Sequence, residues 1–182
     1  MSKDLECKLN HKYLLDKILH DRLIVSDKVL KIAKPKIIFL LREPENTIKS
    51  IINMGYIENI EWCRDPVKAT DYYCSRLSRL EEYAKKIKGG YFFIDSNDLM
   101  DKTESILDGL TKWLNLHKPL DKRYSVFRYT GKPGHGDPSD NIKSGILTKT
   151  KDYPDILIPV EVLTKGDSSY KKCKDSLLRG AV

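Results

Sequence analysis

The sequence predicts an α/β domain in which a central, mainly parallel sheet is flanked by helices. Two continuous apolar runs rich in β-forming residues, KIIFLL (36–41) and YFFI (91–94), have the composition of strands buried on both faces. Each run is followed by a segment with helical apolar spacing, and this alternation is typical of parallel sheets. The chain has 182 residues, of which 40% are hydrophobic, so residues 1–182 are expected to form a single domain with its own core.

The N-terminal residues offer weaker signals. LECKL (5–9) alternates apolar and polar residues and could form a strand, whereas YLLDKIL (13–19) and DKVLKIAK (27–34) have helical spacing. No apolar stretch approaches the roughly 18 residues of a membrane span, and the start lacks the apolar segment of a secretion signal. The four cysteines form no CxxC pair, which indicates reduced thiols and no zinc site. The expected location is therefore cytoplasmic.

The first strand is followed by two predicted helices. Pro44 suits a first helical position, and that helix should run from about residue 45 to 54. A longer helix should begin near Asp65-Pro66 and end at Gly89-Gly90. Its core-facing stripe would consist of Tyr73, Leu77, Leu80, Ala84 and Ile87.

After the second strand, DSNDL (95–99) has turn and helix-cap chemistry, and apolar spacing predicts a helix around 106–114. The stretch from 127 to 145 is too rich in glycine for a helix and is expected to be a loop, either functional or flexible. ILIPVEVL (156–163) could add a late strand or extended segment, and SSYKKCKDSLL (168–178) a closing helix.

The end of the first strand carries the best candidate site. Arg42 lies where ligands bind in open α/β sheets, beside the N-terminus of the next helix. A guanidinium and a helix N-terminus together favour a phosphate, and Ser50, four residues after Asn46, could add a hydroxyl from the same helix face. Alternatively, Arg42 pairs with a neighbouring glutamate and Ser50 is ordinary surface. The net charge of +7 favours anionic partners, although a lysine-rich soluble surface would give the same value.

The segment KIIFLLREPENTIKS (36–50) resembles the 3'-phosphate-binding segment of the PAPS-dependent sulfotransferases, in which Arg-x-Pro follows a strand and a serine follows the arginine by eight residues. Residues 91–116 resemble the strand, turn and helix that come later in that family, although the tyrosine of its turn is absent. The loop GKPGHGDPSDNIKSG (131–145) is similar to its glycine-rich cofactor loop, with Gly136-Asp137 as the matching pair. The resemblance covers about residues 5 to 178.

This resemblance implies a P-loop-type sulfotransferase fold and sulfuryl transfer from PAPS (3'-phosphoadenosine-5'-phosphosulfate) to a hydroxyl or amine of a small-molecule acceptor, without a metal. The cofactor contacts it implies are Arg42, Ser50, Lys132 and Gly136. The base would be His11, with Glu6 and His20 as alternatives, and Lys8 would stabilise the bridging oxygen. The aromatic residues Trp62, Tyr72, Tyr73 and Tyr83 could line an acceptor pocket, but core packing is the favoured interpretation.

One element of the family is expected to be missing. Its N-terminal strand and glycine-rich phosphosulfate loop should precede the Arg42 strand, yet no glycine occurs between Met1 and Lys36. The alternative function is therefore a non-catalytic, shortened sulfotransferase-like domain that binds adenosine 3',5'-bisphosphate or a partner chain. A P-loop nucleotide kinase is excluded because GxxxxGK[ST] does not occur. A nucleic-acid partner is not expected because the lysines are scattered, and a membrane partner is not expected either.

Overall fold

The structure is a computed structural model that describes residues 15, 17–18, 25–87, 89–131, 140–149 and 152–182. The chain divides into two compact units, Met1–Lys34 and Pro35–Val182. In the first unit, α2 (Asp27–Ala33) confirms the helix expected at 27–34; the Ser26 side chain accepts a hydrogen bond from the N–H of Val29 at 3.3 Å. The strand expected at 5–9 and most of the helix expected at 13–19 lie outside the described residues.

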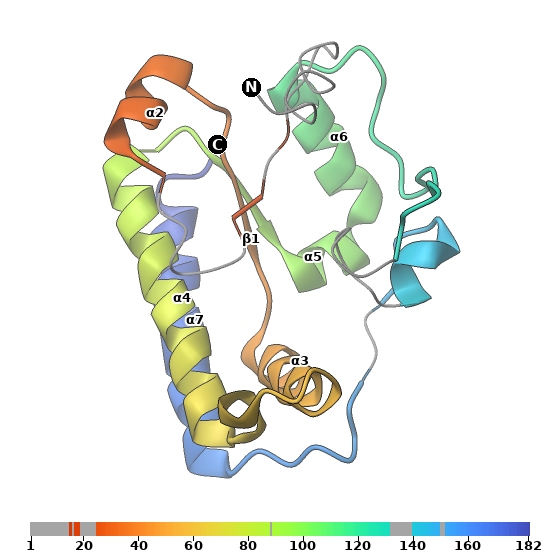
Figure 1. Cartoon of the computed structure of the whole chain (residues 1–182). Coiled ribbons are helices and arrows are strands. Elements are labelled where there is room, and N and C mark those ends of the chain that lie inside the picture. The colour runs from red at the N-terminus through yellow and green to blue at the C-terminus, as the bar shows by residue number, and fades with distance from the viewer. Residues whose placement is uncertain (1–14, 16, 19–24, 88, 132–139, 150–151) are drawn as a thin grey trace. The chain divides into compact units, whose positions relative to one another are not determined.

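The second unit carries the elements that surround the candidate site (Figure 1). Its strands are β1 (Ile38–Leu41) and β2 (Phe92–Asp95). Its α-helices are α3 (Pro44–Ile57), α4 (Pro66–Ile87), α5 (Ser96–Asp101), α6 (Thr103–Leu114) and α7 (Val160–Leu178). Short 3-10 helices occur at Glu61–Arg64 and Asp140–Ser144. The predicted order of strand, helices, strand and helices is confirmed.

The sheet is parallel, as predicted, but small. β1 and β2 pair in register from Ile38 opposite Phe92 to Leu41 opposite Asp95. Tyr91, just before β2, forms an isolated parallel bridge with Ala181. Within the described residues the sheet has two strands, so the larger central sheet that the sequence predicts is not seen there. The parallel register brings the carboxyl ends of both strands to one edge.

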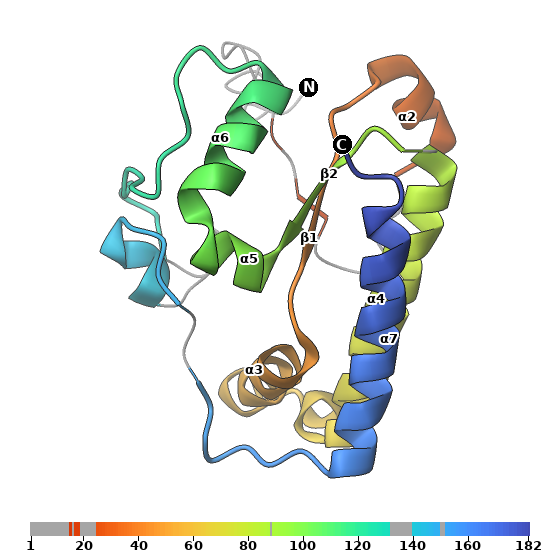
Figure 2. The same ribbon diagram turned by 180° about the vertical axis from the view of Figure 1, so that it is seen from behind.

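The core lies where β1 faces α4 and α7. Figures 1 and 2 both show α4 and α7 lying side by side, and Cys173 Sγ of α7 is 3.6 Å from the carbonyl oxygen of Leu77 of α4. Gly166 of α7 allows a close approach to α3, since an added Cβ would lie 3.1 Å from Pro44 Cβ. The fully or nearly buried members of this core are Phe39, Leu41, Ile48, Ile52, Ala69, Tyr73, Leu77, Ala84, Tyr91, Cys173 and Leu177.

The ends of α4 and α7 differ in how well the sequence predicted them. Gly89 and Gly90 have φ values of 93° and 76°, a conformation that favours glycine, and they follow α4 as expected. Residues 156–159 are not part of a strand, and the late strand or extended segment expected at 156–163 is wrong from Val160 onwards, because Val160–Leu163 form the first turn of α7. Their β-branched residues favour a strand, but packing of α7 against α4 and α3 overrides that preference.

A buried carboxylate joins α7 to the tip of β2. Asp95 is 2% exposed, and its side chain accepts hydrogen bonds from the Tyr170 hydroxyl, from Lys174 Nζ at 2.7 Å and from the N–H of Asn97 at 2.9 Å. Burial acts to raise the pKa of Asp95, but the hydrogen bonds from Lys174, Tyr170 and the Asn97 N–H outweigh it and hold the pKa below its ordinary value. Asp95 is therefore ionised in the folded protein at neutral pH.

The Asp95 network should make stability depend on acid. Because its pKa is lower folded than unfolded, its contribution is fully present above the ordinary aspartate pKa of about 3.9 and is lost as the pH falls further. Asp95→Asn should lower the free energy of unfolding at neutral pH by roughly 1–3 kcal/mol and flatten its dependence on pH in the acid range. Urea unfolding across this range measures both effects.

The matched control is Asp98→Asn on α5. Asp98 Oδ1 lies 3.0 Å from Lys102 Nζ in an exposed ion pair. Exposed pairs contribute little, so this variant should remain close to wild type. An Asp95→Asn protein as stable as Asp98→Asn at neutral pH would contradict a stabilising role for the network.

Candidate anion-binding site

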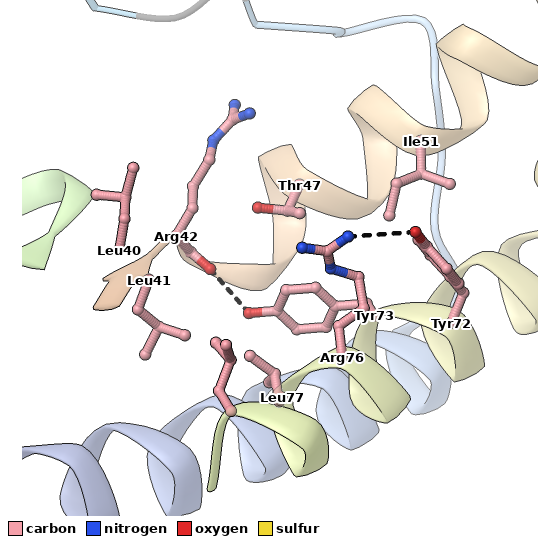
Figure 3. A pocket seen from close by; sticks show the side chains of 10 residues that line it. Leu40, Leu41, Arg42, Thr47, Ile51, Tyr72, Tyr73, Arg76 and Leu77 are labelled. Carbon is pink, nitrogen blue, oxygen red and sulfur yellow. Dashed lines mark hydrogen bonds between the residues drawn. The ribbon is translucent and has the colours of Figure 1, made fainter. Parts of the chain in front are cut away.

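A cavity opens at the carboxyl end of β1, between α3 and α4 (Figure 3). Its volume is about 270 Å³. Apolar side chains make up much of its wall, and two arginines, one from the strand tip and one from α4, supply positive charge. The lining residues are Leu40, Leu41, Arg42, Thr47, Ile51, Tyr72, Tyr73, Arg76, Leu77 and Leu80.

The backbone of Arg42 is held in place by a hydrogen bond from a core residue, Tyr73. The Tyr73 hydroxyl donates a hydrogen bond of 2.8 Å to the Arg42 carbonyl oxygen, and the tyrosine is 4% exposed. Burial raises the pKa of Tyr73 far above its ordinary value, with smaller contributions from Tyr170 and Glu43. The phenol therefore stays protonated and remains a donor at all ordinary pH values, which holds the strand tip beside the cavity (Figure 3).

The start of α3 differs from the sequence prediction in one important respect. Pro44 occupies the first helical turn as expected, but the Glu43 carboxylate caps the helix, with oxygens 3.2 and 3.3 Å from the Asn46 N–H. An anionic side chain thus occupies part of the helix N-terminus that was expected to face a ligand. Glu45, the other neighbouring carboxylate, pairs with Lys49 at 2.7 Å.

The second cation of the cavity comes from the middle of α4. Arg76 Nη1 donates to the Tyr72 hydroxyl at 3.3 Å, and its guanidinium lies 5.8 Å from the Tyr72 ring centroid. In Figure 3, the Thr47 side chain lies between the Arg42 and Arg76 side chains. The Thr47 hydroxyl donates to the Glu43 carbonyl oxygen at 2.6 Å, so its oxygen is oriented by the helix backbone. Two arginines and a threonine therefore line one partly apolar cavity, and in Figure 3 the two guanidinium groups lie on opposite sides of Thr47.

The structure describes two of the predicted site residues. Arg42 lines the cavity, at the strand tip where the sequence placed it. Ser50 is half-buried on α3, three residues after Thr47 and so on a neighbouring part of the helix surface, but the cavity wall is formed by Thr47 and Ile51 instead. A direct role for Ser50 stays a prediction. The other predicted or alternative site residues lie outside the described residues: Lys8, His11, Lys132, Gly136, Glu6 and His20.

Sequence reasoning missed Thr47 and Arg76 and underrated Tyr72. The core interpretation of Tyr73 is confirmed, yet Tyr72 and Tyr73 also line the cavity. Arg76 follows Tyr72 by one helical turn, a spacing that predicts contact on one helix face. The sequence did not reveal that this face of α4 lines the same cavity as Arg42, because that depends on how α4 packs on β1.

Comparisons with known proteins provide no family for this chain. No known protein family, curated protein or solved structure matches it significantly. In the part of the chain that the structure describes, no group of three or more His, Cys, Asp or Glu side chains is arranged to hold a metal ion. No helix in that part is both long and apolar enough to cross a membrane.

The hydrogen bond from Tyr73 is open to a direct test. Tyr73→Phe keeps the ring in the core but removes the donor to the Arg42 carbonyl oxygen, so the free energy of unfolding should fall by about 1–2 kcal/mol. Tyr56→Phe removes a hydroxyl from a residue that is 60% exposed and should change stability little. Equal stability of the two variants in urea unfolding would show that the Tyr73 hydroxyl does not hold the strand tip.

Proposed function

We propose that this chain binds the 3'-phosphate of an adenosine nucleotide in the Arg42 cavity and transfers a sulfuryl group from PAPS to a small-molecule acceptor. The observation that carries the proposal is the position of Arg42. It lies at the tip of a parallel strand, directly before a helix that begins with Pro44, and it lines a cavity of about 270 Å³. This is the arrangement implied by the resemblance of residues 36–50 to the sulfotransferase 3'-phosphate segment.

The donor set of the cavity fits a phosphate. Arginine offers a planar fork of N–H donors that matches phosphate oxygens, and two arginines line this cavity. Leucine side chains around them exclude part of the solvent, which strengthens charge interactions. The cavity is also close to the carboxyl edge of a parallel sheet, where ligands commonly bind in α/β proteins.

The finer parts of the proposal follow the sequence. The fold would be a sulfotransferase-like α/β domain with a central sheet, of which β1 and β2 are two strands. PAPS, when bound, supplies the sulfuryl group for an in-line displacement. His11, or alternatively Glu6 or His20, would take the proton of the acceptor hydroxyl or amine, and Lys8 would stabilise the charge on the bridging oxygen. Ser50, Lys132 and Gly136 would add contacts to the nucleotide.

A second candidate function uses the same cavity without chemistry. In it, the domain binds adenosine 3',5'-bisphosphate or a partner chain and does not transfer sulfate. The observation that favours it is that the cavity is lined by residues between Leu40 and Leu80, so anion binding there needs none of the proposed catalytic residues. An assay for bisphosphate release from PAPS with phenol and amine acceptors separates the two candidates.

Removing the Arg42 guanidinium should weaken nucleotide binding. Because charge-assisted hydrogen bonds to a phosphate are among the stronger ones, Arg42→Ala should raise the Kd for adenosine 3',5'-bisphosphate by about 10- to 100-fold, and Arg42→Lys by less. Isothermal titration calorimetry measures both. Arg79→Ala is a suitable control because Arg79 pairs with Glu82 on an exposed part of α4. The proposal fails if wild type gives no binding, or if Arg42→Ala binds as wild type does.

Glu43 should oppose the bound phosphate. Its carboxylate caps the helix beside the cavity, so Glu43→Gln, which keeps an acceptor oxygen but removes the charge, should lower the Kd for adenosine 3',5'-bisphosphate by about two- to fivefold. Glu45→Gln is the matched control because Glu45, the second residue of α3, already has its charge paired with Lys49. Binding by Glu43→Gln that is unchanged or weaker would mean that the carboxylate does not compete with the ligand.

A further inference from the structure

The proposed contacts of Arg42 and Ser50 leave the second arginine of the cavity unexplained. We propose that Arg76 is a second cationic contact for the bound phosphate, which makes the cavity selective for phosphomonoester dianions over monoanions of the same shape. This inference rests on the proposed function because it concerns the same cavity. It adds a residue from α4 and a charge requirement that the resemblance does not supply.

The first argument is the way Arg76 is held. The Tyr72 hydroxyl accepts a hydrogen bond from Arg76 Nη1 at 3.3 Å, and the Tyr72 ring lies within 5.8 Å of the guanidinium carbon. Arg76 is half-buried rather than extended into solvent. A guanidinium that is already oriented loses less conformational entropy when an anion binds, so this arrangement suits a binding residue.

The second argument is charge. Arg42 and Arg76 reach the same cavity from different elements, and Leu40, Leu77 and Leu80 share its wall. A ligand that carries two negative charges is attracted more strongly to two positively charged residues in a partly apolar space than a ligand of the same shape that carries one. A phosphomonoester carries close to two charges at neutral pH, because its second pKa is about 6, whereas a sulfate monoester carries one.

The third argument is size. A volume of about 270 Å³ lies just below the range of about 300–1,000 Å³ that is usual for small-molecule pockets. The cavity therefore suits a phosphate with the group attached to it rather than a whole nucleotide, which would extend beyond it. In Figure 3, the Thr47 side chain lies between the two arginines; its hydroxyl proton is donated to the Glu43 carbonyl oxygen, so the two arginines, rather than Thr47, would donate to a phosphate.

The test uses two probes of the same shape and different charge, phenyl phosphate and phenyl sulfate, with adenosine 3',5'-bisphosphate as the nucleotide. Ligand-observed NMR titration measures the phenyl esters, and calorimetry measures the nucleotide. Wild type should prefer phenyl phosphate, and its affinity should fall as the pH is lowered through about 6, where the phosphate becomes a monoanion. Arg76→Met should weaken phosphate binding by about 10- to 100-fold and remove most of the preference and the pH dependence.

The matched control is Arg79→Met, the same substitution three residues further along α4, at an arginine that pairs with Glu82 outside the cavity wall. It should bind both phenyl esters as wild type does. Thermal unfolding of both variants shows whether Arg76→Met remains folded, and Arg76→Lys should restore part of the preference for phosphate. The inference is overturned if Arg76→Met keeps the wild-type preference and pH profile, or if wild type binds neither phenyl ester.

The outcomes also separate this inference from the proposed function. If phenyl phosphate binds through Arg76 but adenosine 3',5'-bisphosphate does not bind, the nucleotide function fails and the dianion site remains. If the bisphosphate binds and depends on Arg42 but not on Arg76, the nucleotide function remains and the role of Arg76 is refuted.

Discussion

The candidate site depends on one hydrogen bond between the core and the strand tip, from the Tyr73 hydroxyl to the Arg42 carbonyl oxygen. Tyr73 is buried within the core, so its position is set by the packing of α4 on β1. The same bond fixes the backbone from which the Arg42 side chain leaves. The cavity wall from α4 and the arginine of the strand are therefore positioned together, and a change in the docking of α4 would displace both.

The C-terminal helix contributes to this geometry without lining the cavity. Asp95 holds Tyr170 and Lys174 at the tip of β2, and Gly166 allows α7 to approach the start of α3. Asp95 is opposite Leu41 in the parallel register, and Leu41 directly precedes Arg42. The residue of β2 that contacts α7 therefore lies beside the end of β1 that leads to Arg42. Residues distant in the sequence thus support a site that is built from residues 40–80.

Local signals predicted the elements better than they predicted the site. The apolar runs before Arg42 and in YFFI gave both strands, and the pair Gly89-Gly90 gave the end of α4, because these features reflect backbone preference and burial. The start of α7 was misjudged because helix packing overrode the β-preference of its residues. The position of Arg42 directly after β1 was predicted because a strand end has a local signature. The sequence did not predict that Glu43 caps α3 or that Arg76 lines the same cavity as Arg42, because both depend on side-chain orientation and on contacts across the fold.

The reactivity of Cys173 reports on the separation of α7 from α4. It is fully buried between α7 and α4, and burial raises the pKa of its thiol to about 12. A thiol reacts with alkylating reagents as the thiolate, so Cys173 is inert while the two helices remain in contact. The rate at which an alkylating reagent modifies Cys173 in the native protein therefore reports how often α7 separates from α4. The same separation would loosen the contacts that support the strand tip.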